Sequence, residues 1–107
     1  GAGQYRVPIN GCENGATNWL TLTVAGLLPE STEISVTSRV AETAEALSNG
    51  EGVTAGPFAL TPGDDPFPVE IETLPEHSFM ELGFSLVGHE ETTPLLRSFN
   101  VEFQCSP

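Results

Sequence analysis

The sequence predicts an all-β fold, an antiparallel β-sandwich of about seven strands. Apolar and polar residues alternate with a period of two along most of the chain, which is typical of half-buried strands. Groups of Gly, Pro, Asn and Asp interrupt this alternation about every 8–14 residues, as turns between short strands do. The regular alternation of strands and long helices that indicates a parallel sheet is not seen. With 107 residues, the chain is expected to form one domain, 1–107.

The first expected strand, Tyr5–Ile9, places Tyr5, Val7 and Ile9 on one face. Pro8 lacks a backbone N–H, so we expect this strand at a sheet edge or beginning at a bulge. An alternating segment near a chain end can also pair with the open sheet edge of another subunit. Pairing within the domain and strand exchange with a neighbour both stay open, and Tyr5, Val7 and Ile9 are the candidate interface residues.

The clearest strand is Thr17–Leu27. Leu20, Leu22 and Val24 are expected to face the core, and threonines occupy the opposite face. Trp19 falls on the threonine face near the beginning of the strand. It would either cover an edge of the core or be exposed as a contact.

The middle of the chain contains one more strand and the only helix-like segment. Glu33–Val40 alternates again, and Arg39 on its outward face is expected to be a surface ion partner. Ala41–Leu47 is rich in Ala and Glu, which favours a turn or two of helix. We interpret Ala41–Gly52 as a connection that crosses from one sheet to the other. A hairpin that extends the preceding strand is the competing interpretation.

The second half of the chain has four more segments with a strand pattern, at Val53–Leu60, Phe67–Leu74, Ser78–Val87 and about Leu96–Gln104. Gly56-Pro57 interrupts the first of them, and Gly83 is expected to mark a bulge in the third. Strands with this spacing favour a sandwich in the immunoglobulin-like or jelly-roll style.

Cys12 and Cys105 bracket almost the whole chain and are its two cysteines. Their separation matches no zinc-site spacing, and the acidic neighbour Glu13 opposes thiolate formation. Phe103 and Cys105 share the inward face of the last strand, so we expect one disulfide that staples the terminal strands together. A structural disulfide predicts an oxidising location: extracellular, cell surface or periplasm.

The charge of the chain is strongly negative. It has 15 acidic residues, three arginines and no lysine, for a formal net charge of −12. This charge repels phosphate backbones and anionic lipid surfaces, so nucleic-acid binding is not expected. No apolar run approaches the roughly 20 residues that span a bilayer, so membrane insertion is not expected either. Solubility, a high-salt habitat and the binding of hard cations stay open as reasons for the acidity.

Residues that could carry catalysis are few. His77 and His89 lie in expected turns beside acids. No nucleophile elbow, phosphate-binding loop or zinc-protease motif occurs in the sequence. We therefore expect no enzyme, no catalytic residue and no cofactor.

Two acidic segments could offer oxygen or nitrogen ligands to a metal ion. Asp64-Asp65 lies in a tight turn, and Glu70 and Glu72 follow nearby, which is chemistry that suits Ca²⁺. His89-Glu90-Glu91 could serve a transition metal. Because neither spacing matches an established metal loop, we assign no metal site.

Carbohydrate binding would need exposed aromatic side chains as stacking platforms. Tyr5 and Trp19 are the plausible ones, and Phe58 and Phe79 are exceptions to the inward pattern of the other phenylalanines. These few candidates keep a lectin-like function open as an alternative.

The missing catalytic motifs, the expected disulfide and the β-rich pattern favour a secreted or cell-surface structural or interaction module without catalytic activity. A subunit of an extracellular filament is one form of this hypothesis. Its partner would be a protein, including a second copy of the chain in a homo-oligomer. The alternative is a small ligand-binding module for Ca²⁺ or carbohydrate.

Overall fold

The computed structural model describes residues 2–13, 15–60 and 66–106. These residues form two antiparallel sheets and one short helix, which confirms the predicted all-β sandwich with a disulfide between its terminal strands. The elements in chain order are β1 (Ala2–Asn10), β2 (Ala16–Leu27), β3 (Glu33–Ala41), α1 (Ala44–Ser48), β4 (Val53–Ala59), β5 (Phe67–Glu70), β6 (Phe79–Val87) and β7 (Leu95–Ser106).

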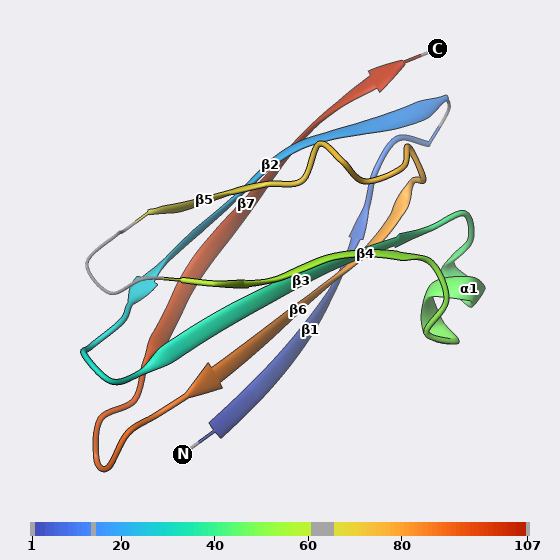
Figure 1. Ribbon diagram of the computed structural model, residues 1–107. Coiled ribbons are helices and arrows are strands. Elements are labelled where there is room, and N and C mark those ends of the chain that lie inside the picture. The colour runs from blue at the N-terminus through green and yellow to red at the C-terminus, as the bar shows by residue number, and fades with distance from the viewer. Residues whose placement is uncertain (1, 14, 61–65, 107) are drawn as a thin grey trace.

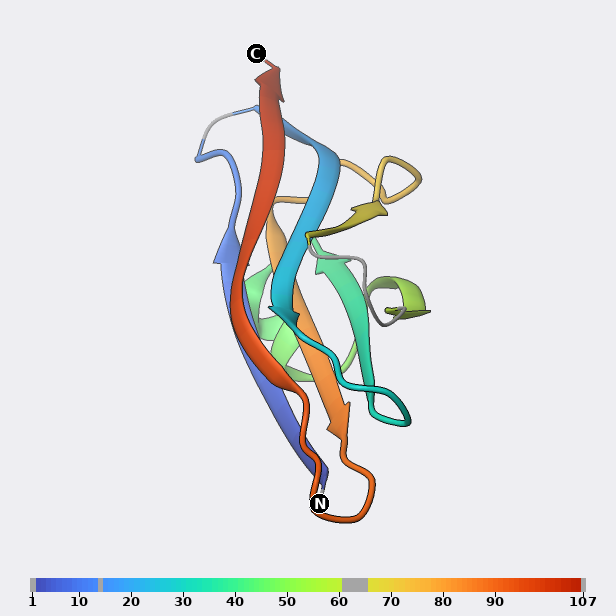
Figure 2. The same cartoon turned by 90° about the vertical axis from the view of Figure 1, so that its left-hand side faces the viewer.

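The two sheets differ in size. The larger sheet has the strand order β1-β6-β3-β4, and the smaller sheet has the order β5-β2-β7. Every pair of neighbouring strands is antiparallel. Figures 1 and 2 show the sheets as two layers, with α1 protruding beside one end of β3 and β4. Each sheet therefore has two edge strands. β1 is one edge of the larger sheet, and β7 is one edge of the smaller sheet.

The core lies between the two layers. In β3 and β6 every second residue is buried, as the two-residue period of a strand requires. The aromatic rings of Phe84 from β6 and Phe99 from β7 meet across the layers, with ring centroids 5.4 Å apart. Apolar side chains that are almost fully buried come from both sheets: Leu22, Val24, Ile34, Val36, Val40, Met80 and Leu82.

Trp19 departs from the predicted pattern of β2. The register between β2 and β7 shifts between Trp19 and Thr21, which is a β-bulge. A one-residue shift moves side chains to the opposite face. Trp19 is therefore buried in the core at 1% exposure, and Leu20, which we expected inside, is only half-buried. The indole Nε1 donates a hydrogen bond to the carbonyl oxygen of His77 at 2.8 Å, which satisfies its polar atom.

The connection between β3 and β4 does not cross between the sheets, because these strands are neighbours in the larger sheet. The predicted crossing at Ala41–Gly52 is therefore wrong, and the competing hairpin interpretation is correct. The helix α1 forms within this hairpin. Thr43 caps the helix by accepting a hydrogen bond from the N–H of Ala46 at 3.0 Å. Arg39 holds it to the sheet, since its Nη2 donates to the carbonyl of Leu47 at 2.8 Å.

Two details of β5 and β6 also differ from the prediction. Gly83 marks no bulge, because the register of β6 runs unbroken past it on both sides. Its lack of a side chain leaves room for Thr37 on β3, whose Oγ1 would lie 2.9 Å from a Cβ at this position. The strand β5 ends at Glu70, since a turn follows in which the N–H of Leu74 donates to the carbonyl of Ile71.

The disulfide joins the connection after β1 to the C-terminal part of β7. The Cα atoms of Cys12 and Cys105 are 5.7 Å apart, within the usual range of about 4.4–6.8 Å. Cys12 is buried, and its N–H donates to Oγ1 of Thr17 at 2.8 Å. Cys105 is exposed, although we expected it on a buried face. The reason is that every residue of β7 from Glu102 onward is exposed, so this part of the strand extends past the core.

Candidate functional site

One side of the sandwich is bordered by strands with an unpaired outer edge. β1 ends the larger sheet and β7 ends the smaller sheet. Both strands run along the same side of the molecule in the same direction (Figures 1 and 2). In the described part of the chain no strand pairs with the outer edge of either. We call this side, residues 2–10 and 95–106, the open edge. An unpaired strand edge presents N–H and C=O groups that can bind another strand.

A groove of about 550 Å³ lies at the open edge between the two sheets. Tyr5 is 56% exposed and Leu95 is 51% exposed, and both side chains line this groove. Exposed apolar surface that gathers in a groove is typical of an interaction site. The lining residues are mostly apolar: Gly3, Tyr5, Leu86, Thr93, Pro94, Leu95 and Leu96.

On the outer face of the larger sheet, β1 borders a second hollow, of about 170 Å³, and most of the residues around it are polar. Arg6 lies opposite Gly83 in the register, and Gln4 lies opposite Ser85. Thr37 contributes a hydroxyl from β3. The strand β1 therefore has an apolar groove on its core side and a polar hollow on its outer side. A strand added to β1 would place its side chains alternately on these two sides.

Charge is distributed unevenly between the open edge and the rest of the chain. The charged residues of β1 and β7 are Arg6, Arg97 and Glu102, so these strands together carry +1. The rest of the chain has 14 acids and one arginine, a net charge of −13. That arginine, Arg39, pairs with Glu81 at 3.1 Å, whereas Arg6 and Arg97 form no ion pair with any residue that the structure describes. The two strands of the open edge therefore carry a small net positive charge, whereas the rest of the chain is strongly negative.

The predicted interface residues Tyr5, Val7 and Ile9 all lie on the core side of β1, opposite buried residues of β6. Tyr5 is exposed, whereas Val7 and Ile9 are half-buried and pack against the core. β1 pairs with β6 along its whole length, so the segment belongs to its own sheet in this structure. Its role as an interface stays a prediction, and Tyr5 offers the most surface for it.

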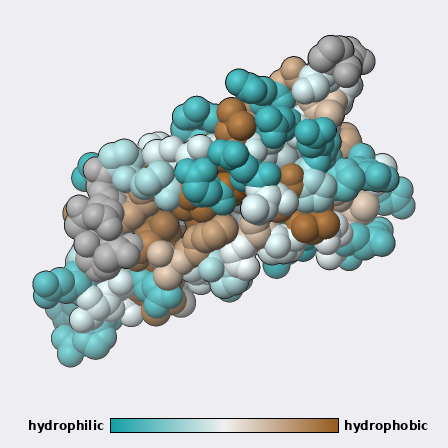
Figure 3. Space-filling view, turned by 45° about the horizontal axis from the view of Figure 1, so that its top comes forward, coloured by the Kyte–Doolittle hydropathy of each residue, from teal (hydrophilic) through white to brown (hydrophobic). Residues whose placement is uncertain are grey.

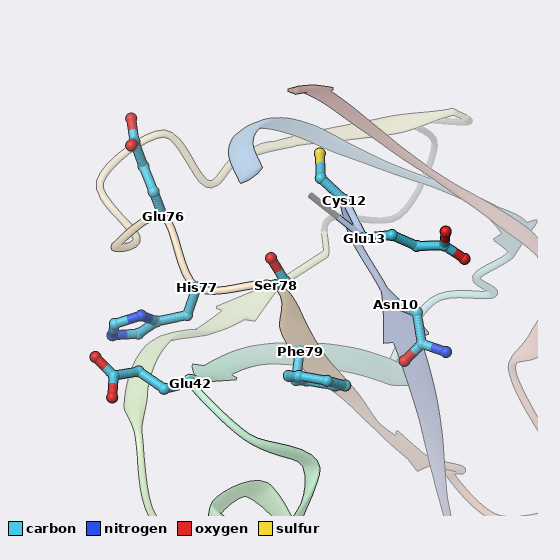
Figure 4. A pocket seen from close by; sticks show the side chains of 9 residues that line it. Asn10, Cys12, Glu13, Glu42, Glu76, His77, Ser78 and Phe79 are labelled. Atoms are coloured by element: carbon cyan, nitrogen blue, oxygen red, sulfur yellow. The ribbon is translucent and has the colours of Figure 1, made fainter. Parts of the chain in front are cut away.

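A larger pocket, of about 760 Å³, lies beside the disulfide, with three glutamates and one histidine in its lining (Figure 4). His77 and Glu42 point toward one another, and Glu76 points away from them (Figure 4). Ser78 is held in the wall, with its Oγ 3.0 Å from Oγ1 of Thr17. Among the residues described, no three His, Cys, Asp or Glu side chains are arranged so that they could hold a metal ion. We assign no chemistry to this pocket.

The remaining candidates from the sequence are scattered. Asp64-Asp65 lies outside the described residues. Glu70 and Glu72 are exposed, and so is His89, whose Nε2 is 3.9 Å from a carboxylate oxygen of Glu90. As far as the structure describes these side chains, it does not gather them into one site.

The aromatic candidates for carbohydrate binding are also separated. Trp19 is buried, so its ring cannot stack on a sugar. Phe58 and Phe79 are half-buried, and Tyr5 alone among the four candidates is exposed. The structure therefore provides no paired aromatic platform from these four residues.

No protein-family model, curated protein or solved structure matches this chain. Within the described residues, no helix has the length and the hydrophobicity needed to cross a bilayer. The functional argument therefore depends on the geometry of the open edge.

The sequence interpretation missed Arg6, Leu95 and Arg97 as members of one surface. Alternation shows which face of a strand is apolar, but it does not show which strands end each sheet. One signal was present: two of the three arginines lie in the terminal strands, where Glu102 is the single acid.

Proposed function

We propose that this chain is a secreted or cell-surface structural module without catalytic activity, and that it works by assembling with copies of itself. In one form of this function, many copies assemble into an extracellular filament, and the chain is the subunit of that filament. The disulfide supports an oxidising location.

The observation that carries the proposal is the open edge. Here each sheet ends in a strand whose outer edge has no partner among the described residues, Tyr5 and Leu95 expose apolar surface, and the local charge is opposite in sign to that of the whole chain. Soluble proteins usually protect long edge strands, because such edges pair with other chains. An edge of this kind supports protein–protein association more than it supports binding of a small molecule.

Sedimentation velocity of the purified chain tests this function. Two copies that each carry a net charge of −12 repel one another at low salt. Added salt shortens the range of this repulsion to about 10 Å at 0.1 M and about 3 Å at 1 M. We expect association that increases with protein concentration and becomes stronger as salt is added. A chain that stays monomeric at every protein and salt concentration would contradict the proposed function.

The alternative function, a binding module for Ca²⁺ or carbohydrate, has less support. The aromatic candidate with the largest ring system, Trp19, belongs to the core, and the described acidic candidates do not converge. A thermal unfolding series with millimolar Ca²⁺ and with EDTA checks the metal part. If Ca²⁺ binds, a Ca²⁺ concentration of about 100 times the dissociation constant would stabilise the fold by about 2.7 kcal/mol.

A further inference from the structure

We propose that β1 pairs antiparallel with β1 of a second copy, with Tyr5 opposite the partner's Tyr5. The larger sheets of the two copies then join into one continuous sheet across a two-fold axis. This inference rests on the proposed function, and it adds the strand that makes the contact and the register of the contact.

The sequence of β1 is complementary to itself around Tyr5. In an antiparallel pair, opposite residues point to the same face of the sheet. With Tyr5 opposite the partner's Tyr5, each Gly3 lies opposite a Val7 on the core side, and each Gln4 lies opposite an Arg6 on the outer side. The side-chain oxygen of Gln4 in one copy can then accept a hydrogen bond from the guanidinium of Arg6 in the other copy. Gly3 leaves space beside the incoming Val7, since nothing lies within 4 Å of a Cβ built on this glycine.

The two tyrosine rings supply most of the apolar contact. Each ring lies beside the groove of its own copy, where Leu86, Leu95 and Leu96 form apolar walls. Pairing of the strands would bring the rings together over the two grooves. It would bury the tyrosine surface that is exposed in a single copy, where Tyr5 is 56% exposed. Paired aromatic rings stabilise an interface beyond the burial of their area. An interface of this type is isologous, and it closes as a dimer.

The registers centred on the two residues that follow Tyr5 are less favourable. A register centred on Arg6 would place two guanidinium groups directly opposite each other, which destabilises a strand pair. A register centred on Val7 would move Pro8, which has no N–H, toward the middle of the contact. The register centred on Tyr5 avoids both problems and keeps Pro8 near the end of the paired stretch.

Charge indicates a second copy as the occupant. β1 contains one arginine and no acid, so its pairing with another β1 creates no contact between carboxylates. The remaining repulsion comes from the net charge of −12 on each copy, and salt weakens it. An acidic strand from a different protein would bind through Arg6 and would be released by salt. The direction of the salt effect therefore separates the two occupants.

The test compares Tyr5→Lys with the matched control Val53→Lys. Val53 is 47% exposed on β4, at the opposite edge of the same sheet, and both changes add one positive charge. In sedimentation experiments at 1 M salt, we expect Tyr5→Lys to weaken dimerisation at least tenfold and Val53→Lys to leave it close to that of the unchanged chain. Circular dichroism and the unfolding midpoint of each variant verify that it folds.

A second variant tests the register. Mild oxidation of Tyr5→Cys should give a disulfide-linked dimer across the two-fold axis, and Val53→Cys should give none. Mass spectrometry then verifies that the bond between Cys12 and Cys105 is retained. Dimerisation that Tyr5→Lys leaves unchanged, or a Tyr5→Cys variant that still dimerises in sedimentation but does not crosslink, would overturn this inference while self-association of the unchanged chain still supports the proposed function. A monomeric chain would overturn both.

Discussion

At the scale of single residues, Thr17 holds the disulfide end of the sandwich together. Its side chain is fully buried at 0% exposure. Oγ1 accepts a hydrogen bond from the N–H of Cys12 and shares another with the hydroxyl of Ser78. It therefore links three segments: the connection after β1, the beginning of β2 and the segment that enters β6.

We expect Thr17→Val to destabilise the protein by about 1–3 kcal/mol, because valine fills the same volume but leaves the buried N–H of Cys12 without an acceptor. Urea unfolding measures this loss. Thr23→Val is the matched control, since Thr23 lies half-exposed on the same strand and has no side-chain hydrogen bond within the described chain. Equal unfolding midpoints for the two variants would show that the hydrogen bonds of Thr17 contribute nothing.

Trp19 shows where reasoning from single residues reaches its limit. Alternation predicted the faces of β3 and β6 correctly, because the register between these two strands is unbroken. In β2 the bulge moved Trp19 inside, and nothing in the local sequence marks it. A bulge depends on how two strands fit together, so it is a property of the pair and not of one segment.

At the scale of elements, Arg39 couples α1 to the larger sheet. One Nη2 donates both to the carbonyl of Leu47 and to Glu81 on β6, and the arginine is three-quarters buried. The sequence predicted the ion pair as a surface contact. It could not predict the bond to the helix, because the competing interpretations of the connection placed Leu47 differently.

We expect Arg39→Ala to cost more than Glu81→Ala. Arg39→Ala removes the ion pair with Glu81 and also the hydrogen bond from the charged guanidinium to the carbonyl of Leu47, which contributes about 1.5–3 kcal/mol and holds the end of α1. Glu81→Ala removes only the ion pair, and such a pair typically contributes about 1 kcal/mol or less to the free energy of unfolding. Chemical denaturation of both single variants and of the double variant separates these contributions. An equal cost for the two single variants would contradict the link between α1 and the sheet.

At the scale of the whole molecule, the disulfide closes almost the entire chain. Both cysteines were predictable as a structural pair from their spacing and from the acidic context of Cys12. The strand order was not, because several orders bring the two ends of a sandwich together. This is why the sequence suggested Tyr5 as an interface residue but did not reveal that Leu95 and Arg97 lie on the same open edge.

Removal of the disulfide by Cys12→Ser with Cys105→Ser should lower the stability by up to about 4–5 kcal/mol, since a loop of this length strongly restricts the unfolded chain. Urea unfolding of the double variant, compared with the oxidised protein, measures the difference. Identical midpoints would mean that the bridge does not constrain the unfolded state. The exposed position of Cys105 makes the bond accessible to a reductant, so the same comparison can be made by reduction.

The central claim is that the unpaired edge of β1 is the surface on which this chain assembles. Hydrogen exchange of the backbone amides, measured at low and high protein concentration in 1 M salt, tests it most directly. We expect the amides of Gly3–Val7 to become more protected as the concentration rises, while the amides of β4, at the other edge of the same sheet, keep their rates. Exchange in β1 that does not change with concentration, in a sample that associates, would contradict the claim.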